Sequence, residues 1–351
     1  MKILLVTDAW EPQVNGVVRT LRSVTEELER QGHTVWRISP NLFPTVACPT
    51  YPEIRLALFS GSRVARRLRE LGPDAIHIAT EGPLGLAARR WCIRHDIAFT
   101  TAYHTQFPEY LARRTRLPPA LFWRYIRWFH GPAVQVMAST RGVMDQLTAQ
   151  GLARTHLWGR GVDSGCFRPD VPPHPGMAGL PRPIQLYVGR VAVEKNIEAF
   201  LDCPHPGTKV VVGDGPALEE LRRAYPSAHF LGALHGAELA SAYRSADVFV
   251  FPSRTDTFGL VLIEALACGT PVAAFPVTGP ADILTGEVAC LSEDLGAAIA
   301  GALTLSRSAC AAFARQFSWE ASARQFLAGL EPLAPDPEID RPALTETSAK
   351  P

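Results

Sequence analysis

The sequence lacks any arrangement of cysteines that would form a disulfide framework or a zinc site. Its seven cysteines are scattered along 351 residues, with no Cys-x-x-Cys pair and no Cys/His cluster at metal-ligand spacing. A reducing cytoplasm therefore fits the sequence best, because disulfide frameworks belong to oxidising compartments.

Long apolar runs are also missing. No stretch approaches the roughly 20 apolar residues that a membrane span needs. The apolar run at residues 2–7 ends at Asp8 and is too short for a signal peptide. We therefore expect a protein that is not integral to a membrane. Peripheral binding to a membrane surface is still compatible with the sequence.

The chain carries little net charge. It has 35 basic and 34 acidic residues, which gives a formal net charge of +1, so no global field favours nucleic acid or a strongly acidic partner. Apolar residues make up 47% and charged residues 20%, the usual proportions of a soluble globular protein. A length of 351 residues suits two domains, each with its own core.

Short apolar runs alternate with segments of helical spacing. Residues 2–7 are typical of a buried parallel strand, and residues 17–31 have one apolar helical face and end at Gly32. The first half predicts further strands at 34–38, 74–78, 98–102 and 134–138, and helices at 62–71, 84–94 and 140–150. Strands that alternate with helices predict a doubly wound parallel sheet.

A proline-rich segment at 169–183 separates the two halves. It cannot sustain a helix or a strand ladder, so it predicts a hinge. The alternation restarts with predicted strands at 184–188, 209–212, 229–231, 248–251 and 271–275, and helices at 194–201, 217–224, 236–245 and 260–268.

The predicted fold class is α/β, with two Rossmann-like doubly wound domains that face each other across a cleft. We expect a first domain at 1–168, a second at 184–317, a last helix at 318–331 that packs back on the first domain, and a disordered tail at 332–351.

Two acidic residues lie in residues 250–272, the segment with the strongest group of candidate functional residues. A strand leads through a polar turn with Asp256 and Gly259 into a helix that carries Glu264. Free amides at the helix start suit an anion. Eight helical residues rise about 12 Å, more than the roughly 5 Å between the carboxyl groups of a retaining glycosidase. The acids are therefore better placed to hold two parts of one long ligand.

Each acid also has a plainer interpretation on its own, as an N-cap Asp and a solvated helix Glu. Glu264, however, lies among apolar residues with no basic residue nearby in the sequence. A buried carboxylate needs partners, and ligand hydroxyls would serve.

Two cations, Arg190 and Lys195, follow the predicted strand 184–188. At the mouth of a sheet they would stabilise a departing diphosphate. The alternative is a pair of surface cations at a helix start, which the helix dipole disfavours. The sequence has no Asp-x-Asp motif, and we expect neither a divalent metal nor a cofactor.

Other candidates are weaker singly. The first loop has Gly16 but no Gly-x-Gly-x-x-Gly, which argues against an NAD-dependent dehydrogenase. Gly213 and Gly215 permit close backbone approach or form a plain tight turn. His104 stands at the end of a predicted strand, with a capping or core histidine as the alternative.

Together these residues resemble the retaining glycosyltransferases of family 4. The family signature, Glu-x7-Glu followed by Ala-x-Ala-x-Gly-x-Pro-Val, is matched by Asp256, Glu264 and then Ala265, Ala267, Gly269, Pro271 and Val272, with Asp in place of the first Glu. The resemblance implies the GT-B fold and metal-independent transfer of a hexose from a UDP- or GDP-linked donor, with the second domain holding the donor.

The resemblance also implies roles for single residues. Arg190 and Lys195 would stabilise the diphosphate, Asp256 and His104 would position the sugar, and Glu264 would hold the ribose. The remaining implied donor-binding positions are Gly16, Gly189, Gly213, Gly215, Phe258, Gly259 and Leu260.

The acceptor is suggested by similarity and by charge. Arg160 and the segment 275–282 are similar to diacylglycerol glycosyltransferases of the sulfoquinovosyl or glucosyl type, with GDP-mannose-dependent mannosyltransferases as near relatives. Residues 111–130 mix arginines with aromatics, as helices in the headgroup layer of anionic membranes do. The predicted membrane or acceptor contacts are Arg113, Arg114, Trp123, Arg124 and Trp128.

That interpretation predicts a lipid acceptor and a cytoplasmic protein on the inner face of the plasma membrane. Its alternative places the aromatics in the core and the arginines in solvent. Two further function classes stay open from sequence: a sugar-nucleotide epimerase of the same fold, and a sugar-nucleotide-binding protein without catalysis.

Overall fold

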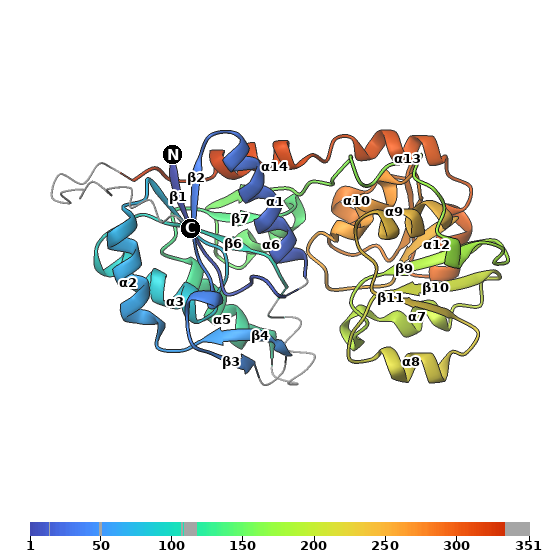
Figure 1. The fold of residues 1–351 in the computed structure, drawn as a ribbon, viewed down its shortest axis with the longest axis horizontal. Coiled ribbons are helices and arrows are strands. Elements are labelled where there is room, and N and C mark those ends of the chain that lie inside the picture. Colours follow the sequence, from blue (N-terminus) through green and yellow to red (C-terminus); the bar gives the residue numbers. More distant parts are fainter. Residues whose placement is uncertain (14, 49–50, 107, 109–117, 334–351) are drawn as a thin grey trace, which may run out of the picture.

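The computed structural model describes residues 1–13, 15–48, 51–106, 108 and 118–333, and it shows two lobes joined by two crossings of the chain (Figure 1). The crossings run together, because the Val162 amide donates to the Phe317 carbonyl at 3.2 Å. The predicted tail lies almost entirely outside the described residues.

The first lobe is built on a parallel sheet in the order β2-β1-β5-β6-β7-β8. Its four central strands, β1, β5, β6 and β7, are buried on both faces, whereas the edge strands β2 and β8 are only partly buried. The strands are β1 (Lys2–Val6), β2 (Thr34–Ile38), β5 (Ala75–Ile78), β6 (Thr100–Tyr103), β7 (Val136–Ala138) and β8 (Thr155–Leu157). The helices around the sheet are α1 (Gly16–Arg30), α2 (Ser60–Leu71), α3 (Pro83–Arg94), α5 (Pro119–His130) and α6 (Arg141–Ala149).

An antiparallel hairpin, β3 (Thr45–Cys48) and β4 (Tyr51–Ala57), is an addition that we did not predict. It is separate from the parallel sheet and lies at the lower edge of the first lobe in Figure 1. The β3 side chains are only partly buried. Without a buried face the sequence has no strong alternation to reveal the strand.

The second lobe repeats the design in the order β11-β10-β9-β12-β13-β14, again parallel. Its strands are β9 (Ile184–Val188), β10 (Thr208–Val212), β11 (His229–Gly232), β12 (Val248–Phe251), β13 (Val272–Ala274) and β14 (Ala289–Leu291). Its helices are α7 (Ile197–Leu201), α8 (Leu218–Ala224), α9 (Gly236–Ser245), α10 (Leu260–Ala267), α11 (Pro280–Ile283), α12 (Leu295–Ala302) and α13 (Arg307–Ala314).

Helices α12 and α13 were also not predicted. Both are rich in alanine, and α12 also contains two glycines, so their sequences show weak amphipathic contrast. Each is instead started by a side-chain cap, from Asp294 for α12 and from Ser306 for α13.

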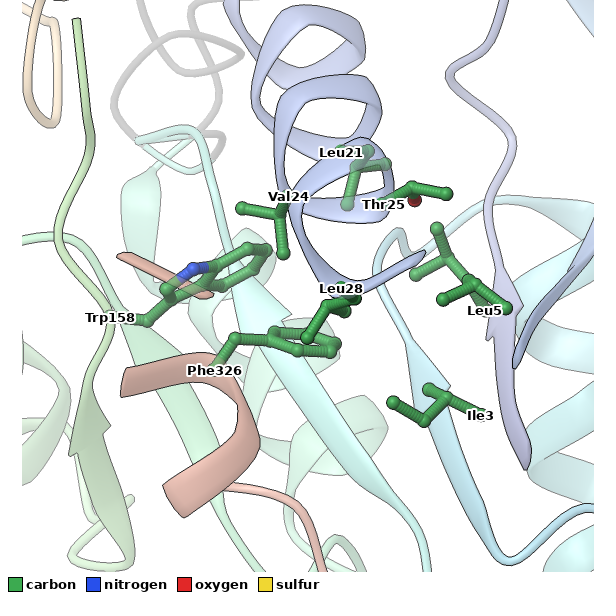
Figure 2. Close-up of a pocket in the computed structure, with 9 residues that line it drawn as sticks. Ile3, Leu5, Leu21, Val24, Thr25, Leu28, Trp158 and Phe326 are labelled. Atoms are coloured by element: carbon green, nitrogen blue, oxygen red, sulfur yellow. The ribbon is translucent and has the colours of Figure 1, made fainter. Parts of the chain in front are cut away.

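The last helix, α14 (Trp319–Ala328), returns to the first lobe and packs against α1. Phe326 lies against Trp158, with ring centroids 4.8 Å apart. A small cavity remains between α1, β1 and α14, and the side chains around it are apolar except for Thr25 (Figure 2). This space is a gap in the core and offers nothing to hold a polar ligand.

No single helix in the described ranges is long and apolar enough to cross a membrane. Two helical stretches, residues 295–302 and 307–328, reach the required length and composition only as a pair, with a bend of 96° between them.

Replacement of Phe326 tests whether α14 is part of the first core. Phe326 is 2% exposed, so Phe326→Ala should lower the free energy of unfolding by about 3–5 kcal/mol through lost burial and a cavity. The matched control is Phe59→Ala at a side chain that is 88% exposed, with an expected change within about 0.5 kcal/mol. Urea denaturation followed by tryptophan fluorescence measures both, and equal losses would contradict the assignment.

Candidate functional site

The order of strands reverses between β1 and β5 in the first sheet and between β9 and β12 in the second. Open parallel sheets bind ligands outside the carboxyl ends of their strands at such switch points. The loop after β9 carries Arg190 and Lys195, and the loop after β12 carries Asp256. The topology therefore brings Asp256 to the loop of Arg190 and Lys195, although Asp256 and Lys195 lie 61 residues apart in the sequence.

The carboxyl edges of the two sheets face each other, and hydrogen bonds join them. The Thr257 hydroxyl donates to the His104 carbonyl at 2.7 Å, and the Ser139 hydroxyl donates to the Thr257 carbonyl at 3.1 Å. The Thr140 hydroxyl donates to Asp282 at 2.5 Å. These bonds place the loops after β6 and β7 directly on the second lobe.

A charged contact crosses between the lobes as well. Arg19 of α1 forms an ion pair with Glu264 Oε1 of α10, and Tyr243 donates its hydroxyl to Glu264 Oε2 at 3.0 Å. The Glu264 side chain is 2% exposed, whereas that of Arg19 is 36% exposed. Glu264 has no basic residue nearby in the sequence, and its cationic partner comes from the other lobe, which sequence proximity could not show.

Two helix starts meet at the same place. A side chain added at Gly16, the first residue of α1, would have its Cβ 3.8 Å from Cδ1 of Leu260, the first residue of α10. Asn15 caps α1 through the amides of Val17 and Val18, but α10 begins after Gly259 with no side-chain cap. Uncapped amides and the positive end of the helix dipole favour an anion there.

Lys195 and Asp256 contact each other directly. Lys195 Nζ lies 2.6 Å from Asp256 Oδ1. Burial raises the pKa of Asp256, but the adjacent Lys195 ammonium, and after it the nearby Ser253 hydroxyl, more than offset this, so the pKa lies below its ordinary value. Asp256 is therefore ionised at neutral pH. Its other oxygen, Oδ2, is buried without a hydrogen-bond partner among the described residues.

The glycines around this loop have a packing reason. A Cβ on Gly213 would lie 1.8 Å from the Gly189 carbonyl oxygen, and one on Gly215 would lie 2.3 Å from that of Val191. Both glycines have φ in the left-handed range, at +144° and +156°. They allow the loop after β10 to press against the loop of Arg190, which Tyr187 also holds through a 2.9 Å bond to the Arg190 carbonyl. Their predicted contact with the donor stays a prediction.

Phe258 is buried in the core of the second lobe, with its ring centroid 6.2 Å from that of Phe317. Only its backbone could face a donor, together with Gly259 and the half-buried Leu260.

His104 follows β6 and is held on several sides. Arg160 Nη2 lies 3.1 Å from its Nδ1, and Trp158 meets the imidazole edge-to-face with ring centroids 5.4 Å apart. Burial, and then the charges of Arg160, His77 and His130, hold the pKa of His104 well below its ordinary value. The side chain is therefore a neutral imidazole at physiological pH.

The predicted membrane residues divide into three groups. Arg113 and Arg114 lie outside the described residues. Trp123 is 4% exposed and stacks on Tyr103, so its predicted membrane contact is wrong and the core alternative holds for it. Arg124 is exposed and Trp128 is 51% exposed, with the Arg89 guanidinium 4.1 Å from the Trp128 ring.

Comparison with known proteins gives the family. Residues 14–165 match the family described as Glycosyltransferase Family 4, and residues 182–307 match Glycosyl transferases group 1. A GDP-mannose-dependent alpha-mannosyltransferase of Mycobacterium tuberculosis is 32% identical, over 81% of this chain and 82% of its own length. The chain belongs to glycosyltransferase family 4.

Other relatives and a solved structure agree. Sulfoquinovosyl transferase SQD2 of Arabidopsis thaliana is 32% identical over 76% of this chain and 54% of its own length. An alpha-monoglucosyldiacylglycerol synthase of Streptococcus pneumoniae is 29% identical over 78% of this chain and 71% of its own length. The fold matches a sucrose-phosphate synthase from Thermosynechococcus elongatus with a TM-score of 0.74, 23% identity and coverage of 93% and 98% of the two chains.

The predicted GT-B fold and the assignment as a hexosyltransferase that uses a sugar nucleotide are thereby confirmed. The comparisons give no support to an epimerase or to an inactive binding protein. Among the described residues of this family 4 glycosyltransferase, no group of three or more His, Cys, Asp or Glu side chains could hold a metal ion.

Replacement of Arg19 tests the contact between lobes. Arg19→Met should lower the free energy of unfolding by roughly 2 kcal/mol, because it leaves the Glu264 carboxylate buried without its cation. The double variant Arg19→Met/Glu264→Gln should recover part of that loss.

Arg22→Met is the matched control on the same helix, since Arg22 is half exposed and its ion pairs with Glu11 and Glu26 are on the surface. Its expected effect is below about 0.5 kcal/mol. Urea denaturation measures the whole set, and strictly additive effects of the Arg19 and Glu264 changes would show that the pair is not coupled.

Proposed function

We propose that this glycosyltransferase transfers a hexose, with retention of configuration, from a nucleoside diphosphate-sugar to a hydroxyl group of a membrane lipid such as diacylglycerol. The observation that carries the donor part is that the loop of Arg190 and Lys195 follows β9 at the edge of the second sheet that faces the first lobe, where the starts of α1 and α10 also meet. Cations and free amides together suit a diphosphate.

In this proposal the diphosphate lies between Gly16 and the start of α10, within reach of Arg190 and Lys195. Negative charge grows on the diphosphate as the bond to the anomeric carbon breaks, and fixed cations stabilise the transition state more than the bound substrate. The acceptor oxygen forms its bond to the anomeric carbon on the face that the diphosphate leaves. Its proton passes to the departing phosphate oxygen.

Two carboxylates would hold the two ends of the donor. Asp256 Oδ2 is buried without a partner in the described part of the chain, and a sugar hydroxyl would satisfy it. Glu264 would take the ribose hydroxyls, which requires Arg19 to release or share one carboxylate oxygen. The half-exposed side chain of Arg19 has room to move, whereas Tyr243 keeps the other oxygen fixed.

The lipid acceptor rests on two supports. One relative is named as a synthase of alpha-monoglucosyldiacylglycerol, and α5 presents Arg124 and Trp128 to solvent on the first lobe. An exposed tryptophan beside arginines is suited to the headgroup layer of an anionic membrane. We infer a cytoplasmic enzyme that binds peripherally to the inner face of the plasma membrane and needs no cofactor beyond its donor substrate.

A donor panel tests the reaction. Purified protein is incubated with radiolabelled UDP-glucose, UDP-galactose, UDP-glucuronate or GDP-mannose and with vesicles that contain diacylglycerol, and products are separated by chromatography. We expect one donor to give a labelled glycolipid. Donor binding without either transfer or hydrolysis would refute catalysis, and an epimerised sugar nucleotide would support the epimerase instead.

Arg190→Ala and Lys195→Ala should each cost about 2–4 kcal/mol of transition-state stabilisation, seen as a lower kcat. The control is Arg222→Ala, because Arg222 lies on the surface of α8 in an ion pair with Glu219. Turnover at the wild-type level in both site variants would remove these residues from the mechanism.

Vesicle binding tests the membrane contact. Arg124→Ala/Trp128→Ala should reduce co-flotation with phosphatidylglycerol vesicles, while hydrolysis of the free donor stays unchanged. Arg222→Ala removes one charge from the other lobe and should float as wild type does. Equal flotation of all three proteins would place the membrane contact elsewhere.

A further inference from the structure

Arg160 is a buried cation that has no carboxylate partner among the described residues. It follows β8 and is 7% exposed, with its guanidinium 4.7 Å from the centre of the Trp158 ring. Nη1 donates to the carbonyls of Trp158 and Gly159, and Nη2 donates to His104 Nδ1 at 3.1 Å. Burial lowers the pKa of Arg160 to about 9, so the group is still charged at neutral pH.

This contact decides which nitrogen of His104 carries hydrogen. A guanidinium has donors only, so the Nδ1 atom that faces it must offer a lone pair. The hydrogen of the neutral imidazole therefore sits on Nε2. That atom is buried and has no hydrogen-bond partner among the described residues, and an unmade bond of this kind costs about 1–3 kcal/mol.

We propose that Arg160 is a positioning residue that holds His104 as the Nε2–H tautomer, so that this N–H donates to an oxygen of the bound donor sugar. The inference rests on the proposed function, in which His104 contacts the sugar. It assigns to Arg160 a task that a purely structural arginine would not have.

The surroundings of His104 support a fixed, neutral donor. His77, on β5, binds the Thr100 hydroxyl through Nδ1 at 2.9 Å, and His130 binds Thr101 at 2.8 Å and Glu81 at 3.2 Å. Charge on either histidine would oppose a proton on His104, as Arg160 does. From the second lobe, the Thr257 hydroxyl fixes the His104 backbone.

A neutral N–H donor has a chemical advantage at this place. It orients a sugar oxygen without adding a further positive charge beside the anomeric carbon, where positive charge develops as the diphosphate leaves. An imidazolium there would oppose that development, and the other tautomer would present a lone pair to the sugar instead of a hydrogen.

Nitrogen NMR reads the tautomer directly. Protein labelled with ¹⁵N-histidine is recorded without donor between about pH 6 and pH 8, and the His104 signals are assigned by comparison with His104→Gln. We expect wild type to show an unprotonated Nδ1 and a protonated Nε2 throughout. An Nδ1–H tautomer in the wild-type spectrum overturns the proposal without any variant of Arg160.

Variants then connect the tautomer with turnover. Arg160→Met should give a mixture of tautomers and lower kcat/KM for donor hydrolysis about tenfold or more, whereas Arg160→Lys, which keeps a charged donor, should recover part of both. The matched control is Arg89→Met. Arg89 is also 7% exposed, donates to the carbonyls of Trp128 and Phe129 and stacks on an aromatic ring, but it does not touch His104.

A tautomer or a kcat/KM at the wild-type level in Arg160→Met overturns the proposal, and so does an Arg89→Met that behaves as Arg160→Met does. If Arg160→Met does not fold, Arg160→Lys and the wild-type spectrum decide: a shifted tautomer with unchanged kcat/KM in Arg160→Lys refutes the role. Failure of the proposed function looks different, because wild type would then process no donor while its His104 spectrum stayed as expected.

Discussion

The ion pair between Arg19 and Glu264 is the interaction on which the site depends, because it is formed between charges from opposite lobes. In the proposed donor site, neither lobe supplies all of the residues. The second lobe brings two carboxylates and two cations, and the first brings a helix start, a histidine and the arginine that neutralises Glu264. A buried carboxylate of this kind is stable only with a partner. Glu264 can therefore stay ionised in the core only while the first lobe holds Arg19 against it.

The polar groups of the proposed site are paired largely with one another. Lys195 is paired with Asp256, Arg19 with Glu264, and Thr257 with the backbone of His104. A donor would replace some of these contacts with contacts of the same chemistry, charge for charge and hydroxyl for hydroxyl. The affinity of such a site depends on the difference in free energy between the protein whose groups pair with one another and the protein whose groups pair with the donor. Modest changes in the donor sugar can alter that difference.

Much of this could be predicted from the sequence. Periodicity predicted five of the six strands in each parallel sheet, but not the three-residue edge strands β8 and β14. The spacing from Arg190 to Lys195 and from Asp256 to Glu264 indicated the loops of the proposed donor site. The β3–β4 hairpin and the alanine-rich helices α12 and α13 were not predicted, because their sequences lack a strong alternation of apolar and polar positions.

The partners of the site residues could not be predicted either. Arg19 reaches Glu264, and Arg160 reaches His104, only through tertiary packing. The burial of Trp123 and Trp128 could not be assigned from the sequence either. The two residues are five positions apart on α5, and tertiary packing places the first in the core and the second on the surface.

The return of α14 to the first lobe has a mechanical consequence. The chain passes between the lobes twice, and the two passages are bonded side by side at Val162 and Phe317. Two chain segments bonded side by side resist sliding and twisting more than bending, so this passage favours a hinge motion between the lobes. The loop at Arg160 lies two residues before Val162, and Cys166, four residues after it, is within electrostatic range of both Arg19 and Glu264, so the contacts between the lobes are gathered next to this passage.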